Sequence, residues 1–255
     1  MDTSLPEMGD WDSVFDETYL RTYLPSTSDA QSREQALAAV SLAEVERGAA
    51  ILDCPCGFGR HAIPLAEAGD LVTGLDRSES QLDEAERRRG EAEWPRLVRG
   101  DYRDLPFEDA SFNAVLTLFS SLGYLERDED VGVLREFRRV LRPGRTLVVE
   151  TAHRDAFARG GVPQSWQQLP DGSLYLEERT FDWAAGTLAD NRIIVTPEGE
   201  RIERPYVLHV YTAKEWVDML GDAGFEEVDA FGAWDGETPI TPAAWRLILR
   251  ARRGA

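Results

Sequence analysis

Lysine, cysteine and long apolar runs are all scarce in this chain of 255 residues. Lys214 is the single lysine, so 27 of the 28 basic side chains are arginine (28 − 1 = 27). The 47 acidic residues outnumber the basic ones, and the formal net charge is −19. Proteins that bind nucleic acid need clustered basic side chains to neutralise phosphates, so this balance argues against a nucleic-acid partner.

The strong negative charge has a second implication. Genome base composition explains the preference for arginine, but the acidity also fits a protein that works in high salt, where ions screen self-repulsion.

The two cysteines, Cys54 and Cys56, are too close in sequence for a comfortable disulfide, and two thiols do not form a structural zinc site. No apolar run approaches the ~20 residues that span a bilayer. The first ten residues are acidic and polar and do not resemble a secretion signal. We therefore expect a cytoplasmic protein without a metal or a membrane contact.

Strands and helices alternate through the first 150 residues. Short apolar runs alternate with amphipathic, Arg- and Glu-rich segments, which predicts a doubly wound, mostly parallel α/β sheet. Ser78 and Thr212 are the expected caps of two helices. The predicted strands of this part cover residues 50–54, 71–76, 97–98, 112–118, 146–150, 225–231 and 245–251, and the predicted helices cover 30–46, 60–68, 78–89, 131–141 and 212–223.

The pattern changes between residues 152 and 211. Segments 173–183, 187–195 and 201–211 are β-rich and separated by turn residues, which predicts an inserted antiparallel meander. The expected organisation is an N-terminal helical segment over the ligand site (1–48), a seven-stranded Rossmann-like core (49–151 and 212–255) and the β insertion (152–211).

A glycine-containing turn follows the first predicted strand. Asp53 ends this strand, and Gly57 and Gly59 let the backbone approach a ligand closely. Asp76 ends the second strand, where a carboxylate can accept hydrogen bonds from both ribose hydroxyls. The ligand should therefore contain a nucleoside.

The same turn also satisfies a loose dinucleotide pattern, G-x-G-x-x-A, over residues 57–62, so a nicotinamide-dependent oxidoreductase is an alternative. Asp53 argues against it, because an acid beside a pyrophosphate is unfavourable and suits a ligand with an ammonium group. A non-catalytic cofactor-binding subunit is a further alternative.

Five motifs occur in order: residues 51–59, Asp76, Gly100-Asp101, residues 112–116 and residues 140–144. Together they resemble the class I S-adenosylmethionine-dependent methyltransferases, in particular the small-molecule type with a β insertion after the fifth strand. The resemblance implies S-adenosylmethionine as cofactor, S-adenosylhomocysteine as product, and a small-molecule acceptor methylated at nitrogen or oxygen. A monomer or homodimer is expected.

The resemblance also implies individual roles. Gly57 and Gly59 would pass under the cofactor, with Asp53 near its amino group and Asp76 on the ribose. The remaining cofactor-binding positions it implies are Arg77, Asp101 and Tyr102 at the adenine, Leu118 and Phe119 at the methionyl arm, and Tyr19 and Tyr23 at the methionine carboxylate.

One departure bears on the acceptor. Amide- and base-methylating relatives carry an Asn/Asp-Pro-Pro-Tyr type motif where this chain has residues 118–124 (LFSSLGY), which argues against nucleobases and Gln side chains as acceptors. No catalytic base stands out. His153, His209 and Tyr211 are the candidates, whereas His61 is expected to pack or cap a helix. The aromatic residues of the insertion, Trp166, Tyr175, Trp183, Tyr206 and Tyr211, either line an acceptor pocket or form core or dimer contacts; we favour the latter.

Overall fold

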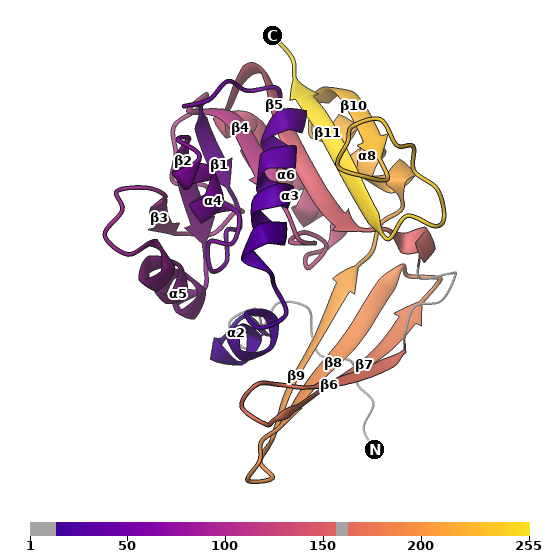
Figure 1. The fold of residues 1–255 in the computed structure, drawn as a ribbon. Coiled ribbons are helices and arrows are strands. Elements are labelled where there is room, and N and C mark those ends of the chain that lie inside the picture. The colour runs from indigo at the N-terminus through magenta and orange to yellow at the C-terminus, as the bar shows by residue number, and fades with distance from the viewer. Residues whose placement is uncertain (1–13, 157–162) are drawn as a thin grey trace.

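The computed structural model describes residues 14–156 and 163–255. They form a seven-stranded sheet with helices on both faces and a separate four-stranded antiparallel sheet (Figure 1). The strands of the larger sheet are β1 (Ala50–Asp53), β2 (Leu71–Asp76), β3 (Arg96–Arg99), β4 (Phe112–Thr117), β5 (Leu141–Ala152), β10 (Phe225–Phe231) and β11 (Arg246–Arg253).

The order of the larger sheet is β10-β11-β5-β4-β1-β2-β3. Strands β1 to β5 run parallel, and β11 runs antiparallel to both of its neighbours. The chain order reverses at β1, which pairs with β2 on one side and with β4 on the other. Open α/β sheets bind ligands at such a switch point, outside the carboxyl ends of the strands.

Alternating side chains of the central strands face two different helical layers. Ala114 and Leu116 of β4 pack towards one layer, while Val115 between them packs towards the other. The first layer contains α3 (Asp29–Leu42) and α4 (Ala62–Glu67), and the second contains α6 (Arg127–Val140) and α8 (Ala213–Asp222). Helix α5 (Glu79–Arg89) packs beside β2 and β3. This two-sided burial explains why these strands are almost wholly apolar.

The predicted elements of the core are present, with differences at their ends. Ser78 caps α5, and Thr212 caps α8 within a reciprocal capping box with Glu215, as predicted. Helix α3 ends at Leu42 rather than at residue 46, because Glu44 adopts a left-handed conformation with φ 53°. Helix α4 begins at Ala62 rather than at residue 60, since the glycine turn extends further than expected.

The smaller sheet has the order β6-β7-β8-β9. The three predicted strands of the insertion correspond to β7 (Leu174–Asp182), β8 (Thr187–Val195) and β9 (Arg201–His209). A fourth strand, β6 (Gln164–Gln168), was not predicted, because its side chains are mostly polar and exposed and show no apolar alternation. Helix α2 (Glu17–Tyr23) lies near β9 below the larger sheet (Figure 1).

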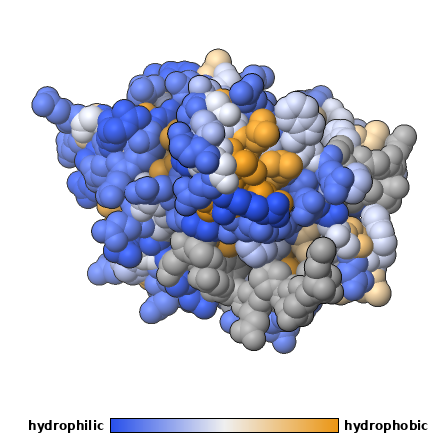
Figure 2. Space-filling view, turned by 90° about the horizontal axis from the view of Figure 1, so that it is seen from below, coloured by the Kyte–Doolittle hydropathy of each residue, from blue (hydrophilic) through white to orange (hydrophobic). Residues whose placement is uncertain are grey.

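The face of the molecule on the side of the smaller sheet is mainly hydrophilic, with one group of apolar side chains near its middle (Figure 2).

Within residues 14–156 and 163–255, each helix is too short or too polar to span a bilayer.

Candidate functional site

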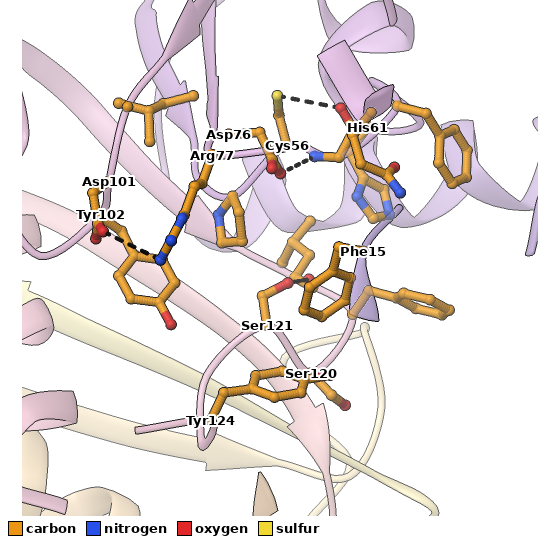
Figure 3. A pocket seen from close by; sticks show the side chains of 18 of the residues that line it. Phe15, Cys56, His61, Asp76, Arg77, Asp101, Tyr102, Ser120, Ser121 and Tyr124 are labelled. Atoms are coloured by element: carbon orange, nitrogen blue, oxygen red, sulfur yellow. Dashed lines mark hydrogen bonds and ion pairs between the residues drawn. The ribbon is translucent and has the colours of Figure 1, made fainter. Parts of the chain in front are cut away.

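A cavity with about 960 Å³ of empty space lies at the carboxyl ends of β1, β2 and β4 (Figure 3). Eight of the predicted cofactor-binding residues line it: Tyr19, Gly57, Asp76, Arg77, Asp101, Tyr102, Leu118 and Phe119. Residues from five separate segments thus meet at the switch point of the sheet.

Asp76 joins the glycine turn to the end of β2. Its carboxylate accepts hydrogen bonds from the backbone N–H of Gly57 at 2.7 Å and of Ser78 at 2.9 Å. Burial raises the pKa of this carboxyl above its usual value, whereas the hydrogen bonds from Ser78 and Gly57 oppose that shift. Gly57 itself has φ 52°, which a residue with a side chain adopts only at a cost. The turn is therefore held rigidly against the cavity.

Asp101 forms a charged group with Arg77 and Arg103 at one side of the cavity, and Figure 3 shows Asp101 beside Arg77. Its carboxylate lies 2.6 Å from Arg103 Nη2 and 3.9 Å from Arg77 Nη1. The hydrogen bond from Arg103 lowers the pKa of Asp101, so the carboxylate is charged near neutral pH. Arg103 already donates to both carboxylate oxygens, so a bound group would share these acceptors with Arg103.

Two polar residues of this cavity escaped the sequence-based prediction. Gln81 is 2% exposed, and neither its Nε2 nor its Oε1 has a hydrogen-bond partner among the described residues. It occupies an ordinary helix position, which gives no sequence signal. Arg60 donates to Gln35 Oε1 at 2.6 Å and covers the Phe119 ring at 4.5 Å, while its Nε and Nη1 have no partner among the described residues. Its position directly after Gly59 could have identified it.

Three other predicted residues do not line this cavity. Asp53 is 1% exposed and lies behind the cavity wall, and burial together with the neighbouring Asp76 raises its pKa to about 8. A Cβ at Gly59 would come within 2.9 Å of Ile63 Cδ1, so this glycine permits close packing of α4. Tyr23 stacks on Tyr19 at 4.3 Å and lines a neighbouring cavity instead.

The candidate bases occupy other places. His153 is buried, with Nδ1 3.0 Å from the carbonyl oxygen of Ala244. His209 stacks on Tyr211, whose hydroxyl donates to Asp130 at 2.9 Å. None of these three candidates lines either cavity. Their positions give no support to a role in proton transfer, because a base must reach the reacting group.

His61 lines the first cavity but makes no capping hydrogen bond with its side chain, contrary to the capping alternative. Burial lowers the pKa of this imidazole well below its usual value, so His61 is neutral near pH 7.

A second cavity, with about 1120 Å³ of empty space, lies between the larger sheet, α2 and the smaller sheet. Five charged side chains line it: Glu150, Arg179, Asp190, Arg192 and Arg246. Of the insertion aromatics, Tyr206 also lines this cavity, whereas Tyr175 and Tyr211 are buried elsewhere and Trp166 and Trp183 are largely exposed. The insertion thus contributes both a cavity wall and ordinary packing contacts.

The two cavities share four lining residues, Tyr19, Phe119, Ser120 and Tyr124. Phe119 and Ser120 both have left-handed backbones, with φ 68° and 55°. Glu150 holds this segment: its carboxylate accepts from Phe119 N at 2.6 Å and its carbonyl oxygen accepts from Ser120 N at 3.0 Å. Such strained conformations cost about 1–3 kcal/mol each and cluster at functional sites. Hydrogen bonds to Glu150 thus hold the strained segment of the shared wall in place.

Comparison with known proteins gives a consistent picture. Residues 51–144 match the model of a family described as a methyltransferase domain. The chain is 34% identical over 151 residues to a cypemycin N-terminal methyltransferase from a Streptomyces species, covering 58% of this chain and 60% of that protein. It is 31% identical over 135 residues to a dTDP-3-amino-3,4,6-trideoxy-alpha-D-glucopyranose N,N-dimethyltransferase from Streptomyces venezuelae, covering 52% of this chain and 55% of that protein.

Among solved structures, the CcbJ methyltransferase from Streptomyces caelestis is similar over nearly the entire chain. The TM-score is 0.79 at 25% identity, and the alignment covers 96% of this chain and 98% of that one. The likeness therefore includes the inserted sheet as well as the core.

Proposed function

Since the chain belongs to the class I S-adenosylmethionine-dependent methyltransferases, we propose that it methylates a small molecule bound in the second cavity, using S-adenosylmethionine held in the first. The observation that carries this proposal is the shared wall of Tyr19, Phe119, Ser120 and Tyr124, because donor and acceptor sites must meet where the methyl group passes. The alternative of a nicotinamide-dependent oxidoreductase is not retained, because the family match and the named homologues indicate a methyltransferase.

The residues of the first cavity fit this cofactor. Asp76 keeps lone pairs for the ribose hydroxyls beyond its two backbone hydrogen bonds, and Asp101 offers a charged acceptor to the adenine amino group. Arg60 has two partnerless nitrogens, suited to the methionine carboxylate. Gln81 offers an unused buried amide on the same lining. When bound, S-adenosylmethionine supplies an electrophilic methyl group on a positively charged sulfur.

The shared wall positions the acceptor and excludes water. Burial raises the pKa of Tyr124 to about 12 and that of Tyr19 further still, so both phenols remain neutral near pH 7 and do not serve as bases. Orientation of two reactants within such a site can lower a barrier by about 7–11 kcal/mol in favourable cases. The wall therefore favours an acceptor that already presents a free lone pair.

We favour nitrogen over oxygen as the acceptor atom. A neutral amine attacks without first losing a proton, whereas a hydroxyl requires a base that the shared wall lacks. The two curated relatives above are named as methyltransferases that act on amino groups, which supports this choice.

Transfer of a labelled methyl group tests the proposal. We expect incorporation from radiolabelled S-adenosylmethionine into an amine-containing fraction of a metabolite extract, and binding of S-adenosylhomocysteine but not NADH in calorimetry. Tight binding of NADH with no binding of S-adenosylhomocysteine would reverse the proposal.

The variant Asp76→Ala tests whether S-adenosylhomocysteine binds in the first cavity. It removes a carboxylate that orders the glycine turn, and charged hydrogen bonds contribute about 1.5–3 kcal/mol, so affinity for S-adenosylhomocysteine should fall by roughly 10- to 100-fold. Asp83→Ala, an exposed position on α5, is the control and should bind normally.

A further inference from the structure

Arg192 of β8 is a buried cation at the second cavity. Arg192 is 6% exposed, and its Nε and Nη1 have no hydrogen-bond partner among the described residues. Three aromatic rings surround the guanidinium carbon: the centroids of Tyr206, Tyr23 and Tyr19 lie 4.2, 5.0 and 5.3 Å away. The side chain is thus held in place by flat apolar surfaces, with unused donors.

The other two arginines of this cavity are already neutralised. Arg179 lies 3.1 Å from Asp190 and 2.5 Å from Glu177, and Arg246 forms an ion pair with the Glu150 carboxylate. Within residues 14–156 and 163–255, Arg192 forms no such ion pair. The cavity therefore contains one arginine whose charge lacks a direct partner.

The surrounding groups hold Arg192 without forming an ion pair with it: the Tyr124 side chain makes a hydrogen bond with Arg192, and Asp190 attracts its charge. Burial raises the pKa of Tyr206 well above its usual value, so its phenol is neutral. Asp190, two positions away on β8, uses its Oδ2 to accept from Arg179 Nε at 3.1 Å and from the Tyr206 hydroxyl at 2.9 Å. The Asp190 charge therefore acts on both arginines, but only Arg179 forms an ion pair with it.

Burial of an unpaired ion costs several kcal/mol, whereas cation–π contacts return about 0.5–2 kcal/mol each. An oxyanion on a ligand would offset this cost, because guanidinium nitrogens bind carboxylates and phosphates through charged hydrogen bonds. The aromatic rings would pack against the apolar part of such a ligand.

We propose that Arg192 determines acceptor specificity by binding an anionic group, a carboxylate or a phosphate monoester, carried by the acceptor. The anion lies beside Tyr23 and Tyr206, and the nucleophilic atom of the same molecule faces the shared wall at Phe119 and Ser120. This inference rests on the proposed function for the acceptor, but anion binding itself is measured without turnover.

Calorimetric titration with three phenyl compounds tests this inference: benzoate, phenyl phosphate and the neutral benzamide. Each is titrated with and without S-adenosylhomocysteine. We expect at least one anion to bind the wild-type protein about tenfold or more tightly than benzamide. The preference should disappear in Arg192→Gln and persist in Arg201→Gln, which changes an exposed arginine of the same sheet.

Arg192→Lys retains the charge and should keep part of the preference, so it serves if Arg192→Gln does not fold, as judged by thermal unfolding. Equal or absent binding of both anions relative to benzamide in the wild-type protein overturns the inference, as does an unchanged preference in a folded Arg192→Gln. Failure to bind S-adenosylhomocysteine in the same titrations would instead count against the proposed donor site. The benzoate and phenyl phosphate arms distinguish the two anion types.

Discussion

Burial of Asp53 keeps its carboxylate away from the cavity, although the residue lies at the predicted position in the sequence. The acid ends β1 beside the glycine turn, as expected, but it is enclosed behind the cavity wall rather than presented on it. Burial is the largest cause of its raised pKa, followed by the charge of Asp76. A sequence shows that an acid follows a strand, but not on which side of the wall the carboxylate lies.

The raised pKa predicts a specific dependence of stability on pH. The pKa of Asp53 rises from 3.8 to about 8 in the folded protein, so the folded state holds a proton that the unfolded state releases. This contribution to stability is fully present below about pH 4 and is lost as the pH rises towards 8. Asp53→Asn lacks the titration, so the melting temperature of the variant minus that of the wild type should increase with pH, by several degrees between pH 5 and pH 8.

Melting curves of both ligand-free proteins across this range test the prediction. Asp83→Asn, at an exposed position, is the control and should follow the wild-type curve. Parallel curves for Asp53→Asn and the wild type would show that Asp53 is ionised in the folded state.

Helix α2 contributes Tyr19 to the walls of both cavities. Its cap, Asp16, accepts from Thr18 N at 2.8 Å and forms an ion pair with Arg204 of β9 at 2.8 Å. The helix thereby fixes Tyr19, which lines both cavities, relative to the inserted sheet. Loss of this one carboxylate should disturb both binding sites.

Asp16→Ala should destabilise the protein by about 1 kcal/mol through the lost cap and weaken S-adenosylhomocysteine binding several-fold through the movement of Tyr19. Ser28→Ala is the matched control, because Ser28 caps α3 and lines neither cavity. It should lower stability by a similar amount without changing the affinity. Equal affinities of the two variants in calorimetry would contradict the role given to α2.

The elements differ in how well the sequence predicts them. The core strands carry a local signal in their apolar runs, and two helices carry one in their caps, Ser78 and Thr212. These signals were enough to predict the alternation of strands and helices in the core. Strand β6 carries no such signal. The second cavity was also unpredictable in detail, because its wall combines Tyr23, Glu150, Arg192 and Tyr206 from distant segments that meet only in the folded chain. Buried charges such as Arg192 resemble surface charges in a sequence.

The excess of acidic residues acts at the scale of the whole molecule. A net charge of −19 produces self-repulsion that dissolved salt screens, while individual surface ion pairs contribute little. Raising KCl from 10 to 500 mM should therefore stabilise the protein by about 1 kcal/mol, which corresponds to roughly 2–4 °C for a chain of this size.

Differential scanning calorimetry measures this shift. Replacement of the exposed Glu91 and Glu93 by Gln reduces the net charge and should make the salt effect smaller. A melting temperature that falls or stays constant with added KCl would show that attractive ion pairs outweigh the repulsion.

The most direct test of the two-cavity account is a crystal structure of the protein with S-adenosylhomocysteine. We expect the nucleoside between Asp76 and Asp101 in the first cavity, with the sulfur directed at the wall of Tyr19, Phe119, Ser120 and Tyr124. A ligand bound elsewhere, or one whose sulfur faces away from the second cavity, would contradict the account.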